Sequence, residues 1–219
     1  MNNNTGVIVI YINKIEVGEN KSNCYLVGEK KGEITVIDPG AEGKKIFETV
    51  KEIGSKITQI INTHGHFDHI GGNKYLKEKT QASLMIHWKE EEYLINSQIN
   101  LSALIGIETI SPPADKLLED KDSIQIGNNY FQVLLTPGHS PGGISLYCRE
   151  KGVIFSGDTI FSNGIGRTDL PGSNKEQLEK SIENILLKLN NNTIVYPGHG
   201  QSTTIKKFKK QVWNINTGF

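Results

Sequence analysis

The chain of 219 residues contains 36% hydrophobic residues, enough to form the core of one α/β or β-sandwich domain spanning residues 1–219. Its 24 Lys and Arg residues equal its 24 Asp and Glu residues, so the formal net charge is zero. A balanced charge excludes the basic surface typical of nucleic-acid-binding and membrane-surface proteins, and we expect neither kind of partner.

In the first half of the chain, short apolar or alternating runs predict strands, and apolar residues three or four positions apart predict helices. The expected strands cover residues 7–12, 24–27, 33–37, 57–61 and 84–87. The expected helices cover residues 43–53, 70–79 and 88–95, whereas residues 96–114 show no regular period.

The second half repeats this order of strands followed by a helix. Strands are expected at residues 123–126, 130–135, 143–147, 153–156 and 193–196. Residues 175–189 carry Leu178, Ile182, Ile185 and Leu189 on one stripe, which predicts an amphipathic helix that faces the core. Two sheets, each accompanied by helices, predict a four-layer sandwich with the helices outside.

The N-terminal residues and the cysteines bear on the cellular compartment. Residues 1–5 lack the basic and apolar segments of a secretory signal peptide, and no run of about 18 apolar residues could span a membrane. Cys24 and Cys148 each lie in an apolar strand-like run, so we expect buried free thiols rather than a disulfide. A cytoplasmic protein is therefore expected.

Five of the six histidines fall in three short glycine-containing segments, each directly after an apolar strand-like run. These segments read His64-Gly-His-Phe-Asp-His69, Pro137-Gly-His139 and Pro197-Gly-His199. Asp158 also follows an apolar run, and its two carboxylate oxygens could bridge two ions. Side chains presented from strand ends by a rigid scaffold commonly form a site.

Imidazole and carboxylate groups without cysteine suit a borderline divalent ion such as zinc, iron or manganese. The spacing of His64 and His66 places both rings on one side of an extended segment, and Gly65 would let the backbone approach the ion. Asp68 and His69 are expected immediately before the helix at residue 70, where they can face a second ion.

Four further polar residues have less specific patterns. His87 stands apart from the other histidines and is expected to be an ordinary hydrogen-bonded residue. Asp38 fits a turn former and a partner of a metal ligand equally well. Arg167 is a candidate substrate-binding residue, although a surface ion pair with Asp169 is the commoner outcome for such a pair.

The segment His64-Gly-His-Phe-Asp-His69 resembles the His-x-His-x-Asp-His signature of the metallo-β-lactamase superfamily, and the later histidine and aspartate segments follow in the order used there. The segments Ser156-Gly-Asp-Thr-Ile-Phe161, Gly166-Arg-Thr-Asp-Leu-Pro171 and Pro197-Gly-His199 are similar to the glyoxalase II group, the hydroxyacylglutathione hydrolases, in particular their short bacterial forms. This resemblance implies an α/β fold, an αββα sandwich of two mixed sheets, with two bound divalent metal ions. Zinc is favoured, and iron and manganese are the other options.

The resemblance also implies a role for each site residue. His64, His66 and His139 would hold the first ion, Asp68, His69 and His199 the second, and Asp158 would bridge them. Asp68 and His69 would be catalytic together with a hydroxide held at the metal site, since bound metal lowers the pKa of water toward about 7. The net positive site would attract an anionic acyl-thiol substrate. The implied activity is thioester hydrolysis of the hydroxyacylglutathione hydrolase type.

Two other hypotheses remain open. The segment Gly164-Ile-Gly-Arg-Thr-Asp169 is similar to one in the persulfide dioxygenases, which use a single iron held by two His and one Asp. Only about twenty residues follow His199, whereas full-length glyoxalase II enzymes carry a helical region there that grips glutathione, so the thiol carrier is open. A non-catalytic metal-binding member is disfavoured, because seven candidate ligands exceed what one structural ion requires.

Overall fold

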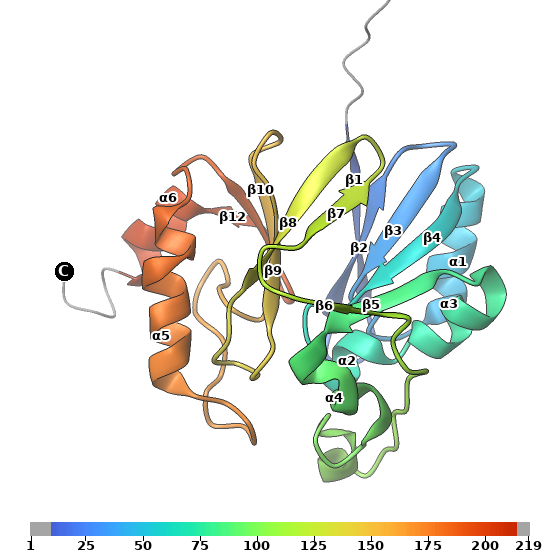
Figure 1. The fold of residues 1–219 in the computed structure, drawn as a ribbon, viewed down its shortest axis with the longest axis horizontal. Helices are drawn as coiled ribbons and strands as arrows, with labels where there is room; N and C mark the ends of the chain where they lie inside the picture. Colours follow the sequence, from blue (N-terminus) through green and yellow to red (C-terminus); the bar gives the residue numbers. More distant parts are fainter. Residues whose placement is uncertain (1–9, 214–219) are drawn as a thin grey trace, which may run out of the picture.

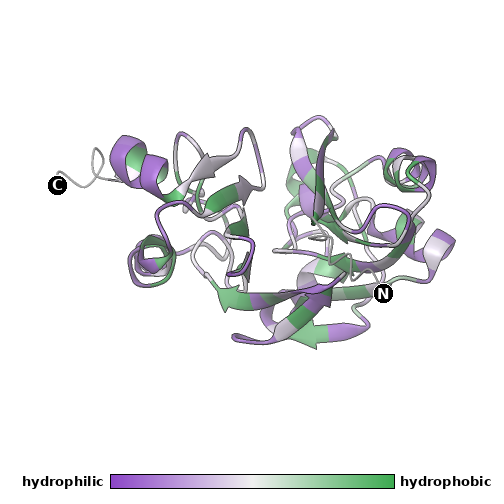
Figure 2. Cartoon of the chain, turned by 90° about the horizontal axis from the view of Figure 1, so that it is seen from above, coloured by the Kyte–Doolittle hydropathy of each residue, from purple (hydrophilic) through white to green (hydrophobic). Residues whose placement is uncertain are grey.

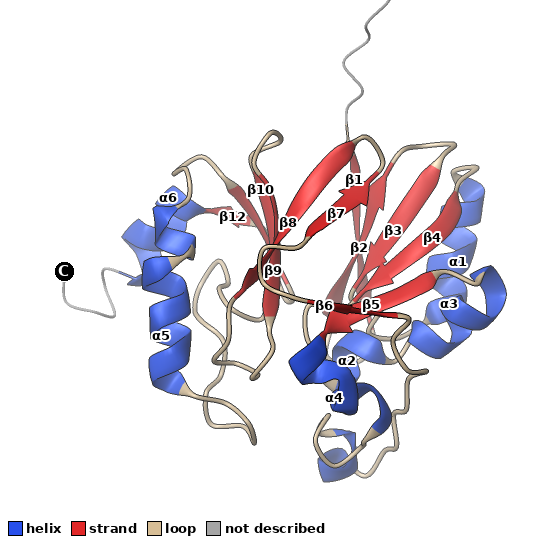
Figure 3. Ribbon diagram, in the orientation of Figure 1, coloured by secondary structure: helices blue, strands red, loops and turns tan. Residues whose placement is uncertain are grey.

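Two six-stranded sheets face each other, and helices cover the outer face of each, so the chain forms four layers (Figure 1; Figure 3). The computed structural model describes residues 10–213. The first sheet contains, in spatial order, β1 (Tyr11–Val17), β2 (Ser22–Gly28), β3 (Glu33–Ile37), β4 (Lys56–Ile61), β5 (Ser83–His87) and β6 (Lys116–Leu118). The second contains β12 (Thr203–Thr204), β11 (Ile194–Pro197), β10 (Val153–Gly157), β9 (Ile144–Cys148), β8 (Asn129–Leu135) and β7 (Ser123–Ile126).

Both sheets are mixed, as expected. In the first sheet the pairs from β3 to β6 are parallel, and the pairs from β1 to β3 are antiparallel. In the second sheet only β10 and β11 are parallel to each other. The carboxyl ends of the central strands therefore point to the same edge of the sandwich, which is where side chains can gather into a site.

The helices divide between the outer layers and the sheet ends. Next to the first sheet lie α1 (Gly43–Glu52) and α3 (Asn73–Thr80), and next to the second lie α5 (Lys175–Asn184) and α6 (Ile205–Phe208). The short elements are α2 (Phe67–Ile70), α4 (Glu91–Ile95), η1 (Trp88–Glu90), η2 (Ser102–Ile105), η3 (Leu186–Lys188) and the π-helical turn η4 (Lys209–Trp213). Hydrophobic and hydrophilic stretches alternate along the outer helices (Figure 2), as expected for helices that pack on a sheet by one face.

Three apolar layers hold these four structural layers together. Between the sheets, Tyr25 and Ile61 pack with Phe131 and Phe155. A second layer lies between the first sheet and its helices, and a third, which includes Leu178 and Ile182 as expected, lies between the second sheet and its helices. Cys24 and Cys148 are buried free thiols, which confirms the expectation from their surroundings.

Several expected elements differ in their bounds. The first strand begins at Tyr11 rather than residue 7, because its register is fixed by antiparallel pairing with β2, and residues 7–9 lie outside the described residues. The helix expected at 70–79 is split, since Gly72 donates its backbone N–H to Pro39 O at 2.6 Å between α2 and α3. Asp68 and His69 thus lie inside α2, not before a helix.

Other differences concern two of the expected helices and two short strands that the sequence did not reveal. Residues 88–95 form a 3-10 turn before a short α-helix, and the helix expected to reach residue 189 ends at Asn184 and continues as η3. Strands β6 and β12 are too short to show a period of their own. No helix within residues 10–213 is long and apolar enough to cross a membrane.

Candidate metal centre

The seven predicted ligands come from four strand ends and meet at one edge of the sandwich. His64 and His66 follow β4, His139 follows β8, Asp158 follows β10 and His199 follows β11. Asp68 and His69 are delivered by α2, directly after His66. The structure therefore brings together segments far apart in sequence, such as His69 and His199, which are separated by 130 positions.

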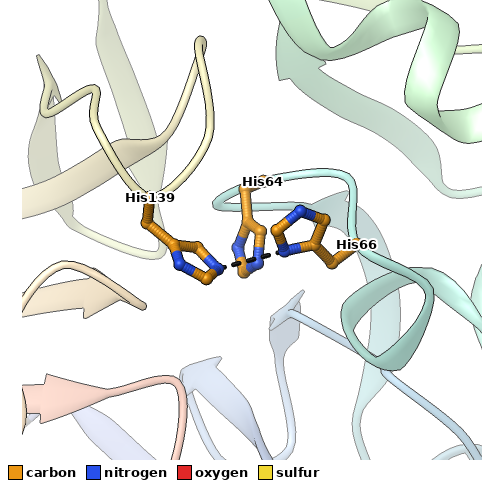
Figure 4. Close-up of side chains that lie close together, drawn as sticks. All are labelled: His64, His66 and His139. Carbon is orange, nitrogen blue, oxygen red and sulfur yellow. Dashed lines mark hydrogen bonds between the residues drawn. The ribbon is translucent and has the colours of Figure 1, made fainter. Parts of the chain in front are cut away.

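The first donor set consists of His64, His66 and His139 (Figure 4). One ligand atom from each of these buried side chains lies within 4.8 Å of the other two. Nδ1 of His66 and Nε2 of His139 are 3.0 Å apart, and the rings of His64 and His66 have centroids 4.7 Å apart. The i, i+2 spacing thus places both rings on one side, as predicted.

The second donor set consists of Asp68, His69 and His199, again with one ligand atom each within 4.8 Å of the others. Nε2 of His69 and Nε2 of His199 are 3.3 Å apart, and Oδ2 of Asp68 lies 3.4 Å from His199 Nε2. The Asp68 carboxylate is held by the side chains of Asn20 and Ser22, which each donate to Oδ2 at 3.2 Å.

Asp158 lies between the two sets. Its Oδ2 is 3.6 Å from His139 Nε2 in the first set and 3.5 Å from His199 Nε2 in the second. Its Oδ1 is 3.6 Å from His69 Nε2 and has no hydrogen-bond partner among residues 10–213. A carboxylate in this position can contact two ions at once, which is compatible with the bridging role expected for it.

One buried carboxylate orients two of the rings. Thr63 Oγ1 donates to Asp38 Oδ2 at 2.6 Å, so its oxygen is left to accept from His64 Nδ1 at 3.2 Å. His69 Nδ1 also lies 3.2 Å from Asp38 Oδ2. A proton on His64 Nδ1 leaves the Nε2 lone pair of that ring directed at the site. Nε2 of His69, on the far side of its ring from Asp38, faces Asp68 and Asp158. Asp38 is thus a partner of ligands, and its φ of 51° shows that it forms a turn as well.

Two backbone carbonyls orient two more rings in the same way. His139 Nδ1 lies 3.0 Å from Arg167 O, and His199 Nδ1 lies 3.2 Å from Asn20 O. Because a carbonyl oxygen only accepts, each Nδ1 carries the proton and each Nε2 offers a lone pair. Four of the five rings therefore present Nε2 to the site, and His66 presents Nδ1.

Burial and neighbouring charges give the two donor sets different proton affinities. Burial lowers the pKa of His64 well below its ordinary value and lowers that of His66 to about 3, so both rings are neutral at pH 7. Burial also disfavours a charged His69, but the carboxylates of Asp158 and Asp68 outweigh it and raise its pKa to about 10. An ion bound by His69 must therefore displace a proton.

The residues fit a divalent metal ion. The buried Nε2 of His64 has no hydrogen-bond partner within residues 10–213. Such a group, like Asp158 Oδ1, is costly unless something else satisfies it. Imidazole nitrogens and carboxylate oxygens are the donors that zinc, iron and manganese accept, and no thiol is present in either set.

Sequence reasoning missed Glu90, which is fully buried and connects the two ligand loops. Its Oε2 accepts from Gly65 N at 3.0 Å, between His64 and His66, and its Oε1 accepts from Gly142 N at 2.7 Å, just after His139. Glu90 lies in a run of three glutamates that suggests only a solvated helix face. No local signal could have revealed its role.

The reason for glycine at position 65 also differs from the expectation. A Cβ there would collide with Tyr93 Cβ, so Gly65 permits close packing of the loop on α4 rather than approach to the ion. Gly198 is the glycine that borders the metal centre, because a Cβ would collide with Asp158 Oδ1 and come within 2.9 Å of His69 Cε1.

The two remaining candidates lie outside the donor sets. Arg167 makes two 2.9 Å hydrogen bonds to Asp169, and both side chains are 68% exposed at the rim of the cleft above the centre. His87 is buried and its Nδ1 accepts from Lys89 N at 3.3 Å, which agrees with the prediction of an ordinary hydrogen-bonded residue.

Comparisons with known proteins agree with this geometry. Residues 17–199 match the sequence profile of the metallo-β-lactamase superfamily. A probable metallo-hydrolase, YqgX of Bacillus subtilis, is 39% identical over 193 residues, which cover 88% of this chain and 91% of the relative. The hydroxyacylglutathione hydrolase GloC of Haemophilus influenzae is 32% identical over 196 residues, which cover 87% of this chain and 91% of the relative. The chain therefore belongs to the metallo-β-lactamase superfamily.

Solved structures show the same architecture. The crystal structure of BLEG-1, a B3 metallo-β-lactamase, superposes with a TM-score of 0.87 at 36% identity, covering 91% of this chain and 97% of that chain. TTHA1623, solved in a di-iron-bound form, superposes with a TM-score of 0.82 at 33% identity, covering 91% and 98%. These matches confirm the predicted αββα sandwich.

Proposed function

We propose that this chain is a single-domain metal-dependent hydrolase that cleaves anionic thioesters of the hydroxyacylglutathione hydrolase type. It would use two divalent metal ions, and zinc is the favoured metal. The observation that carries the proposal is the second donor set of Asp68, His69 and His199, which shares Asp158 with the first. Two adjacent donor sets with a shared carboxylate are typical of two-metal hydrolysis. The free thiols of the chain support a cytoplasmic location.

In this proposal, His64, His66 and His139 hold one ion, Asp68, His69 and His199 hold the other, and Asp158 contacts both. Bound divalent ions would supply hydroxide at neutral pH and polarise the thioester carbonyl.

The protein's own contribution is positional. Asp38 and Thr63 fix the orientation of His64 and His69, so that these rings need no reorganisation during the reaction. We propose Asp68 and His69 as the catalytic residues, because both belong to the second set and Asp68 reaches the cleft, where its side chain is 17% exposed.

The relative named as a hydroxyacylglutathione hydrolase supports the thioester class, since it matches nearly the whole of this chain. A mononuclear iron dioxygenase would leave the second donor set without an ion. That set is complete, because the ligand atoms of Asp68, His69 and His199 lie within 4.8 Å of one another. A protein that binds metal for structure alone would close its site, whereas here the ligands open into a cleft.

Metal analysis combined with paired assays tests the proposal. Purified protein should contain about two metal ions per chain and should release free thiol from S-lactoylglutathione in the absence of oxygen. One iron per chain, with oxygen consumption on glutathione persulfide and no thioester cleavage, would instead establish the dioxygenase. Metal without either activity would establish the non-catalytic member.

Asp158→Ala tests the shared carboxylate directly. Loss of this group should lower the metal content below two ions per chain and reduce kcat by about 10²-fold or more. His87→Ala is the matched control, because His87 is a buried histidine at a strand end that contacts neither donor set, and it should retain both metal ions and activity. An active, fully loaded Asp158→Ala protein would contradict the bridging role.

A further inference from the structure

The cleft above the metal centre is lined by both donor residues and apolar side chains. The cleft has a volume of about 740 Å³, and its donor residues include His66, Asp68 and Asp158. Its apolar side chains, here called the apolar wall, are Phe67, Leu101, Leu104, Ile105, Phe161 and Leu170. None of these six side chains has a polar atom, so whatever lies against them cannot be recognised by hydrogen bonds from the wall.

The segment that supplies half of the wall is held rigidly in place. Fully buried Asn100 donates to Tyr93 O at 3.0 Å and to Thr109 O at 2.8 Å, and its Oδ1 accepts from Ser102 N and Oγ. Its backbone oxygen accepts from Phe67 N at 3.0 Å, at the start of α2. This segment, green at the lower edge of Figure 1, is thereby fixed relative to the helix that delivers two metal ligands.

The rigid segment keeps large apolar side chains in solvent at the cleft. Leu104 is 65% exposed and Ile105 is 58% exposed, although both lie on the short helix η2 next to the buried Asn100. Leu101, which precedes this helix and also borders the cleft, has a φ of 72°, a backbone conformation that bulky residues rarely adopt. Leu101 itself is buried, whereas the apolar side chains of Leu104 and Ile105 stay exposed at the cleft, as is typical of a surface that a ligand covers.

Positive side-chain charge at the cleft is scarce. Arg167 is the only lysine or arginine that borders it within residues 10–213, and its guanidinium is already hydrogen-bonded to Asp169. The donor residues and the apolar wall thus differ sharply in chemistry. A substrate that spans the cleft needs a reactive carbonyl near the donors and an apolar part against the wall.

We propose that the apolar wall binds the acyl group of the substrate, and that the enzyme prefers thioesters with an apolar acyl chain of several carbons over those with a short one. This inference rests on the proposed thioester hydrolysis and names the substrate class for that site. The acyl chain covers Leu104 and Ile105, and the thiol carrier extends toward the rim at Arg167. Each added methylene should make binding more favourable, because it removes apolar surface of the acyl chain and of the wall from water.

A series of neutral thioesters tests the proposal on the zinc-loaded protein. S-acyl-N-acetylcysteamine substrates from acetyl to hexanoyl share one thiol, so only the acyl length changes. We expect kcat/KM to rise about twofold to fourfold for each added methylene, as partial to full burial of a methylene predicts. A flat or falling series would overturn the inference.

Two double variants of the same segment locate the effect. Leu104→Ser with Ile105→Ser should flatten the dependence on chain length, because it removes the exposed part of the wall. Ile107→Ser with Ile110→Ser is the control, because these side chains are also exposed, at 47% and 42%, but do not border the cleft. The control should keep the full dependence. A wall variant that retains the dependence, or that changes only self-association in sedimentation experiments, would overturn the assignment.

Calorimetry of product binding gives a readout that does not require turnover. Hexanoate should bind the zinc-loaded protein about tenfold or more tightly than acetate, and the wall variant should lose this difference. Cleavage of thioesters without any preference for chain length would leave the hydrolase intact and refute the acyl site. Tight hexanoate binding without cleavage of any thioester would refute the hydrolase and retain the apolar site.

Discussion

Thr63→Val tests whether orientation of the ligand rings, beyond their presence, sets the affinity of the metal centre. Thr63 is buried, and its hydroxyl connects the Asp38 carboxylate at 2.6 Å with His64 Nδ1 at 3.2 Å. Valine has nearly the same shape, so the substitution removes this connection with little change in packing. Asp38 keeps its bond from the backbone N–H of residue 63 at 2.7 Å.

The expected loss follows from the two bonds that disappear. A hydrogen bond to a charged group contributes about 1.5–3 kcal/mol, and the His64 Nδ1–H would be left unpaired in a buried site. The outer partners of metal-bound histidines typically contribute about 10-fold to 100-fold to metal affinity, which is about 1.4–3 kcal/mol. We therefore expect zinc affinity, measured by competition with a chromophoric chelator, to fall within that range.

Thr35→Val is the matched control. Thr35 is also a buried threonine, located in β3 of the first sheet, but its hydroxyl bonds to Gln59 Oε1 at 3.0 Å, away from the donor sets. It should lose stability in urea unfolding without losing zinc affinity. If both variants bound zinc as tightly as the parent protein, the connection from Asp38 through Thr63 would not orient His64 in the way the geometry indicates.

Two further predictions concern Glu90 and Arg167. Burial raises the pKa of Glu90 to about 7, so Glu90 in the metal-free folded protein keeps a proton that it loses near pH 4.5 in the unfolded chain. The free energy of unfolding should therefore fall by up to about 3 kcal/mol as the pH rises from 4.5 to 7. Glu90→Gln cannot ionise and should lack this decline in urea unfolding at a series of pH values, and parallel curves for the two proteins would refute the assignment. Arg167→Ala should raise KM for an S-acylglutathione more than for a neutral thioester, since the exposed ion pair with Asp169 is weak in water and can yield to an anionic carrier. Equal changes in KM for the two substrates would leave Arg167 as a surface ion pair.

Most of the fold could be predicted because the central strands are buried and carry runs of apolar residues. Strands β2 and β10 are buried at every position, and such runs bounded by glycine or polar residues are the clearest strand signal in a sequence. The first strand was misplaced because β1 lies at the sheet edge with most residues partly exposed, so pairing with β2 rather than hydrophobicity defines its bounds. The helix expected at 70–79 was divided by a backbone contact from Pro39, which no local pattern encodes.

The candidate donor residues could be predicted from the sequence, because histidines and aspartates grouped at strand ends indicate metal chemistry whatever surrounds them. Their arrangement depends on the fold: which ring nitrogen each presents, that Asp158 lies between two sets, and that Asp38 contacts both Thr63, the partner of His64, and His69. Glu90 and the apolar wall likewise depend on contacts between segments far apart in the chain. The physical reason is that the identity of a ligand is a local property, whereas its orientation, its proton and the surface facing it are fixed by neighbours that folding alone brings together.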